Sequence, residues 1–173
     1  ETTTEQESQR IVRARDEGTI KRWLILAPIA LATGQGGAEG LDAEQIEGER
    51  GLRPKAGESS SIRRGERRWQ EVALEDYMID FNVILGHETP WSVAYAVCYI
   101  RSDAEQRELR MLMGSDDEAK VYLNEKQIHK HSSHRTFVAD MDTVPDIALN
   151  AGLNVLVLKV VNETHFHSPF TTF

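Results

Sequence analysis

Apolar residues follow two patterns along this chain, and both are typical of β-strands. Residues 91–100 and 153–161 are largely apolar at odd and even positions alike, so both faces of an extended segment would be apolar there. Such segments are typical of the inner strands of layered β structures. Residues 77–85 carry an apolar residue at every second position. This alternation predicts a half-buried strand.

Shorter apolar runs and turn signals divide the rest of the chain. Further strands are predicted at residues 20–29, 69–72, 109–113, 120–124, 127–131, 137–142 and 147–149. A Gly-Ser-Asp-Asp turn at residues 114–117 separates two of them. Asp42, with Gln45 three residues later, fits a capping box and predicts a short helix over residues 43–49. The glycine-rich residues 31–40 lack the spacing of a nucleotide-binding motif and predict a loop.

These elements together predict an all-β fold. About eight to ten short strands with at most one or two short helices favour an antiparallel β-sandwich of the jelly-roll type. Residues 1–9 contain no apolar side chain, and residues 10–17 offer little more than Ile11 and Val12 for burial. We therefore expect a flexible tail with a short helix over residues 1–17 and a single β-sandwich domain over residues 18–173.

Composition and charge narrow the classes of function. A chain of 173 residues can bury one real core. Its net charge of −8 disfavours nucleic acid and anionic membranes as partners, because both require a basic surface. No apolar run is long enough for membrane insertion. No signal peptide is visible either, and we expect that an upstream signal or anchor is absent from this sequence. Cys98 lies within a predicted core strand, which predicts an inert thiol.

Five segments carry a family resemblance. They read WLILAP at residues 23–28, AYA at 94–96, GSDD with KVYLN at 114–124, LNAGLNVL at 149–156 and KVVN at 159–162. In this order they resemble the β-sandwich modules of secreted or membrane-anchored proteins in planctomycetes, which are similar to galactose-binding-like jelly rolls. The Asp-Asp turn before Tyr-Leu-Asn also resembles sugar-binding domains of the protective-antigen type. The resemblance implies an extracytoplasmic, carbohydrate-binding accessory module. The family's Asn-Gly-Lys hairpin reads Asn124-Glu125-Lys126 here.

The candidate ligand site is built on the acidic turn. Adjacent carboxylates with backbone carbonyls and an Asn can ligate Ca²⁺, which would orient sugar hydroxyls; the alternative is a turn capped by Asp116 with Asp117 in solvent. Among the tryptophans, Trp23 and Trp91 are expected in the core, and Trp69 is the surface candidate for stacking on a sugar ring. The predicted ligand-binding residues are Asp116, Asp117, Tyr122, Asn124, Lys126 and Trp69.

Other polar residues have two interpretations each. The histidines at 129, 131 and 134, and the pair at 165 and 167, could bind a transition metal or form a polar outer face. The arginines of residues 63–68 predict a solvated loop or edge strand, with an anion site as the alternative. Lys159 lies in an apolar strand, and we expect its amine at the rim rather than paired with a carboxylate.

The chain is not expected to be an enzyme. It contains neither a Gly-x-Ser-x-Gly elbow nor a His-Glu-x-x-His motif, and its one cysteine lies in a core strand. We therefore predict a non-catalytic ligand-binding module without a required cofactor, whose partner is a carbohydrate or another protein. The alternative functions are a structural or protein-interaction module without a small ligand and a metal-binding module that uses the histidines.

Overall fold

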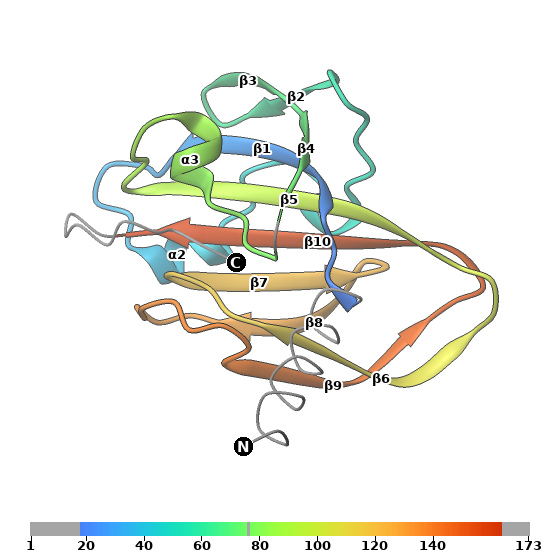
Figure 1. Cartoon of the computed structure of the whole chain (residues 1–173). Helices are drawn as coiled ribbons and strands as arrows, with labels where there is room; N and C mark the ends of the chain where they lie inside the picture. Colours follow the sequence, from blue (N-terminus) through green and yellow to red (C-terminus); the bar gives the residue numbers. More distant parts are fainter. Residues whose placement is uncertain (1–17, 76, 164–173) are drawn as a thin grey trace.

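The computed structural model of this protein describes residues 18–75 and 77–163. Within these ranges the chain is an all-β antiparallel sandwich with ten strands and two short α-helices, which confirms the predicted fold class. The main layer is a six-stranded sheet with the order β4-β1-β5-β10-β7-β8 (Figure 1). Its strands are β1 (Arg22–Ala30), β4 (Gln70–Ala73), β5 (Ser92–Ser102), β7 (Glu118–Leu123), β8 (Lys126–His131) and β10 (Gly152–Asn162).

The two strands that are apolar on both faces lie side by side at the centre of the sheet. β5 and β10 pair without a break in register, from Ser92 with Asn162 to Ser102 with Gly152. β10 separates β5 from β7, although β7 precedes it in the chain. The central position of both strands confirms the prediction from their apolar pattern, because each of them has a core cluster on either side.

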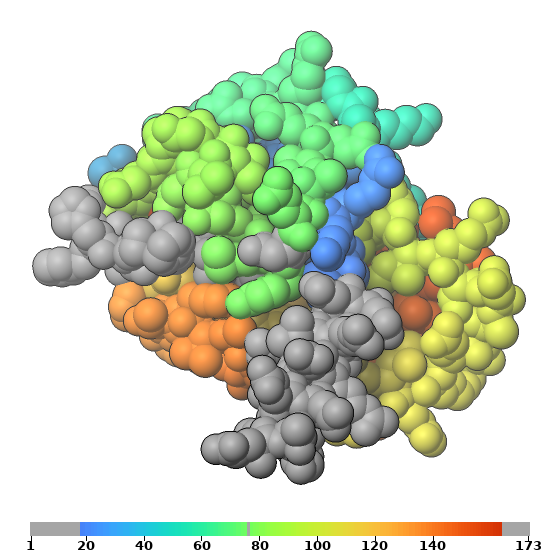
Figure 2. Space-filling view, viewed as in Figure 1, coloured from blue at the N-terminus to red at the C-terminus, as the bar shows by residue number. Residues whose placement is uncertain are grey.

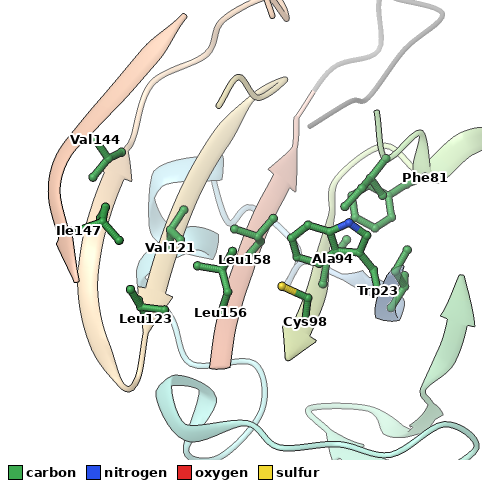
Figure 3. Close-up of a cluster of buried hydrophobic side chains, with 13 residues drawn as sticks. Trp23, Phe81, Ala94, Cys98, Val121, Leu123, Val144, Ile147, Leu156 and Leu158 are labelled. Atoms are coloured by element: carbon green, nitrogen blue, oxygen red, sulfur yellow. The ribbon is translucent and has the colours of Figure 1, made fainter. Parts of the chain in front are cut away.

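One face of the main sheet packs against a second, smaller layer. That layer contains the paired strands β6 (Gln106–Met113) and β9 (Asp142–Leu149) and the helix α3 (Phe81–Leu85). Figure 3 shows the shared core reaching from Val144 and Ile147 on β9 to Trp23 and Phe81. Cys98 lies within this core, and burial raises the pKa of its thiol to about 12. Figure 2 shows the surface of this side, with α3 in light green and β6 in yellow at the right.

The opposite face of the sheet is covered by short elements and loops. These are α2 (Gly37–Asp42), the 3-10 turn η1 (Glu49–Gly51) and the hairpin of β2 (Ser59–Ile62) and β3 (Gly65–Arg68). Leu41, Ile46 and Trp69 pack there against apolar side chains of β5 and β10. The arginines of residues 63–68 lie on the exposed hairpin, in agreement with the predicted solvated loop or edge strand.

Several predicted elements are wrong in type or position. Residues 77–85 do not form a strand, because Asp80 accepts a hydrogen bond from the backbone N–H of Val83 and caps α3, which ends at Gly86. The helix predicted over residues 43–49 lies at residues 37–42, so Asp42 ends a helix instead of beginning one. Residues 137–141 are not a strand, whereas β9 extends from Asp142 through Pro145 to Leu149. The predicted tail, residues 1–17, lies outside the described residues.

Candidate functional site

The structure does not bring the predicted ligand-binding residues together. Asp116 and Asp117 directly precede β7, whereas Asn124 and Lys126 lie beyond its other end, about 20 Å away for a strand of six residues. Tyr122 is buried on the face that packs against α2 and η1. Lys126 is exposed at the start of β8, while Asn124 bonds to Asn154 and Val155 and so holds the turn to β10.

The predictions for two tryptophans are reversed in the structure. Trp69 was expected at the surface, but its side chain is 1% exposed and its indole N–H donates to the Ser60 hydroxyl at 2.8 Å. Trp91 was expected in the core, but it is 37% exposed. The reason is local, because Trp91 has a positive φ of 52° and lies one residue before β5, outside the alternation of the strand.

Trp91 lines a cleft at one end of the main sheet, which we call the Trp91 cleft. Its volume is about 440 Å³, and its lining residues are Leu31, Ala32, Thr33, Gly34, Gln35, Gly36, Trp91 and Glu163. They come from the loop between β1 and α2, the residue before β5 and the residue after β10. The cleft therefore forms where three strands of the sheet begin or end.

Internal hydrogen bonds hold the loop of the cleft in place. The backbone N–H of Leu31 donates to the carbonyl of Trp91 at 2.9 Å, which joins the loop to the opposite wall. The side-chain oxygen of Gln35 accepts from the backbone N–H of Ala32 at 3.1 Å, and the backbone N–H of Gln35 donates to the Ala32 carbonyl at 2.9 Å. Gly34 has a φ of +78°, a conformation that favours glycine. These bonds fix the loop that forms one wall of the cleft.

An acidic cluster adjoins this cleft: Glu163 lines the cleft, and Asp117 and Glu118 lie next to it, with His134 at the edge of the cluster. The N–H of Glu163 donates to Asp117 Oδ2 at 2.8 Å, and His134 Nδ1 lies 2.5 Å from Asp117 Oδ1. The N–H of Gly37 donates to the Glu163 carboxylate. The first turn of α2 and the ends of β7 and β10 are thus linked through carboxylates.

Glu118 is the unusual member of the acidic cluster. It is 2% exposed, and its Oε2 atom has no hydrogen-bond partner among the residues that the structure describes. The pKa of this carboxyl is raised to about 7, chiefly by burial and to a smaller extent by the charges of Glu163 and Asp117. A Cβ atom at Gly37 would lie 2.4 Å from Glu118 Oε2, so a larger residue there would have to displace the Glu118 side chain.

A second buried carboxylate, Glu49, lies farther along the same face and is fully bonded. Tyr95 and Tyr122 donate their hydroxyl protons to it at 2.5 and 3.0 Å, and Lys159 Nζ donates at 2.8 Å. Lys159 was expected at the rim, but it is completely buried and also donates to the Ala43 carbonyl. Burial lowers the pKa of this amine, and the Glu49 carboxylate partly offsets the shift. This centre fixes the segment after α2 onto the sheet.

The histidines take different partners in the structure. His129 Nε2 lies 3.2 Å from Asp142 Oδ2, His131 bonds to Ser133, and His134 Nδ1 lies 2.5 Å from Asp117 Oδ1. Within residues 18–75 and 77–163, no three His, Cys, Asp or Glu side chains are grouped so that they could hold a metal ion. The second predicted pair, His165 and His167, lies outside the described residues.

Comparisons with known proteins give no relative for this chain. No protein-family model, no curated protein and no solved structure matches it. The resemblance to galactose-binding-like modules therefore stays a prediction. Among the described helices, none has the length and apolar character that crossing a membrane requires.

Proposed function

We propose that this domain is a non-catalytic binding module that takes a sugar-sized polar ligand in the Trp91 cleft. The observation that carries the proposal is the partly exposed indole of Trp91 in the lining of a cleft of about 440 Å³. Small-molecule sites have volumes of roughly 300–1,000 Å³ and combine apolar or aromatic walls with a few polar groups. The cleft has this composition.

The lining offers the groups that a saccharide needs. An indole can stack on the C–H face of a sugar ring, whereas hydroxyls require donors and acceptors nearby. Thr33, Gln35 and Glu163 supply polar side chains, and Gly34 and Gly36 leave the backbone accessible. The predicted resemblance to galactose-binding-like modules supports the same class of ligand, and we propose on this ground that the module belongs to a secreted or membrane-anchored bacterial protein.

The decisive experiment replaces Trp91 with Ala and measures glycan binding by thermal shift and calorimetry. The wild type is expected to gain several degrees in Tm at about 100-fold excess of ligand over Kd, because a ligand that binds only the folded state stabilises it by about 2.7 kcal/mol. W91A should lose this gain. Tyr77→Ala is the control, because Tyr77 is similarly exposed but does not line the cleft.

A second variant tests the cleft without removing an aromatic side chain. Gly36 has a φ of −77°, and a Cβ atom there would have only Glu163 Oε1 within 4 Å, at 3.6 Å, so Gly36→Val adds bulk without backbone strain. G36V should fold normally and lose glycan binding. If wild type, W91A and G36V respond identically to every glycan, the cleft is not the site, and the alternative of a structural or protein-interaction module gains support.

A further inference from the structure

The described lining of the Trp91 cleft is acidic. Of the lining residues that the structure describes, Glu163 alone is ionisable, and neither lysine nor arginine is among them. Asp117 accepts the backbone N–H of Glu163, and His134 Nδ1 lies 2.5 Å from Asp117 Oδ1. The field within the cleft therefore favours a cation over an anion.

The Glu163 carboxylate is also held in position. Its backbone N–H is bonded to Asp117, and its side chain accepts the N–H of Gly37. The Gly37 N–H orients the carboxylate without neutralising it, because a backbone amide carries no charge. A charged group that is ordered before binding loses little conformational entropy when a ligand arrives.

An aromatic ring and a carboxylate in one cleft form a recognition site for an ammonium group. The ring face attracts a cation, and the carboxylate accepts a charge-assisted hydrogen bond from it. A neutral sugar could stack on Trp91, but it would remove water from Glu163 without supplying a counter-charge, which is costly. An ammonium-bearing sugar satisfies both groups.

We infer that the Trp91 cleft selects an amino sugar with a free, protonated amine, with Glu163 as the partner of the amine and Trp91 as the partner of the ring. The inference rests on the proposed function and deepens it by naming the class of ligand. It also assigns a specificity role to Glu163, which follows the last central strand.

The test compares sugars that differ only at the nitrogen. Calorimetry at about pH 6, where the amine is protonated, would measure glucosamine against glucose and N-acetylglucosamine, and galactosamine against galactose. The amino form of the preferred ring should bind about tenfold more tightly than both neutral forms, as expected for one charge-assisted hydrogen bond. Raising the ionic strength from about 0.02 M to 0.5 M should reduce this preference, because salt screens the attraction.

Matched variants assign the preference to Glu163. Glu163→Gln should bind the amino and neutral sugars with equal affinity. Glu125→Gln removes the same charge from an exposed glutamate in the turn at the other end of β7, and it should keep the tenfold preference. Circular dichroism and Tm of each variant would establish that it is folded.

Three results would overturn the inference. Equal binding of the neutral and amino sugars by the wild type would refute the charge selectivity while leaving the proposed sugar site intact. Absence of binding by every sugar would refute the proposed function together with the inference. Binding of tetramethylammonium as tightly as glucosamine would show that the cleft recognises the charge alone, and it would overturn the assignment of a sugar.

Discussion

Glu49 and Glu118 are both buried on the α2 side of the main sheet, yet their surroundings are opposite. Glu49 is 4% exposed and accepts hydrogen bonds from Tyr95, Tyr122 and Lys159. Glu118 is 2% exposed, its neighbours include two further carboxylates, and one of its oxygens lacks a partner in the described part of the chain. Burial alone therefore does not decide whether a carboxylate remains charged, because the number of hydrogen-bond donors around it also matters.

The difference in hydrogen bonding follows from the position of each glutamate relative to the sheet. Glu49 is in a turn that lies across the middle of the sheet, where β5, β7 and β10 each direct one polar side chain towards it. Glu118 is the first residue of β7, at the end where the cleft forms. The Glu49 centre stabilises the fold, whereas Glu118 has an oxygen without a hydrogen-bond partner among the described residues and a raised pKa.

The largest expected effect comes from breaking the Glu49 centre. Replacing Lys159 with Met leaves a buried carboxylate without its cation, and we expect a loss of about 3–5 kcal/mol in the free energy of unfolding, measured in urea. Lys126→Met is the control, because Lys126 is exposed and should change stability by less than about 0.5 kcal/mol. A loss of the same small size for both variants would contradict the role assigned to Lys159.

Glu118 should behave in the opposite way. Its pKa of about 7 in the folded state lies above the usual 4.5, so the unfolded chain loses this proton first as pH rises. The folded state is therefore progressively destabilised between about pH 4.5 and 7. Glu118→Gln does not titrate, and we expect it to be more stable than the wild type by about 3 kcal/mol above pH 7.

The pH dependence provides the control for this prediction. The advantage of E118Q should vanish below about pH 4.5, where Glu118 is protonated in both states. Urea unfolding at several pH values would measure it. An advantage that does not change with pH would mean that Glu118 is not the titrating group, and a destabilised E118Q would mean that the carboxylate has a donor.

The smallest effect is expected from Asp42, which is paired but half exposed. Hydrogen bonds from Lys120 and then from Lys130 lower the pKa of this carboxyl to about 2. The pair therefore contributes stability above about pH 3.8, and this contribution is lost as pH falls through about 2. Because the Asp42 side chain is 54% exposed, Asp42→Asn should cost less than about 1 kcal/mol at neutral pH.

The free energy of unfolding of D42N, measured in urea at low and high salt, can be compared directly with that of K159M and E118Q. The cost should shrink in high salt, because an exposed pair is screened. A loss as large as that of K159M would show that exposure does not separate the two kinds of ion pair in this domain.

The strands were predictable where apolar periodicity and turn residues agree. The segments of β1, β5, β7, β8 and β10 were identified in this way. The segment of α3 was misjudged because Phe81, Ile84 and Leu85 fit a helix as well as the alternation of residues 77–85 fits a strand. The cap at Asp80 and the glycine at 86 decide between the two, and both are visible in the sequence.

The candidate site was less predictable than the fold. Trp91 and Glu163 are 72 residues apart, and only the packing of β1, β5 and β10 brings them to one cleft. Nothing in the sequence shows that Glu49 would pair with Lys159. The amine was therefore predicted at the rim, because burying an unpaired charge is strongly destabilising. Pro90 before Trp91 was a usable signal, because a turn next to a strand can direct its last residue outwards.

The central position of β10 has a consequence for the order in which the domain folds. β10 is the last strand of the described chain, yet its partners β5 and β7 lie on either side of it, and its pairs with β5 join residues 50 to 70 positions apart. During synthesis, two parts of the sheet would therefore have an unpaired edge until β10 is made. One part is β4-β1-β5, and the other is β7-β8. Synthesis of β10 closes the sheet, so folding is expected to be slow, non-local and dependent on protection of those edges.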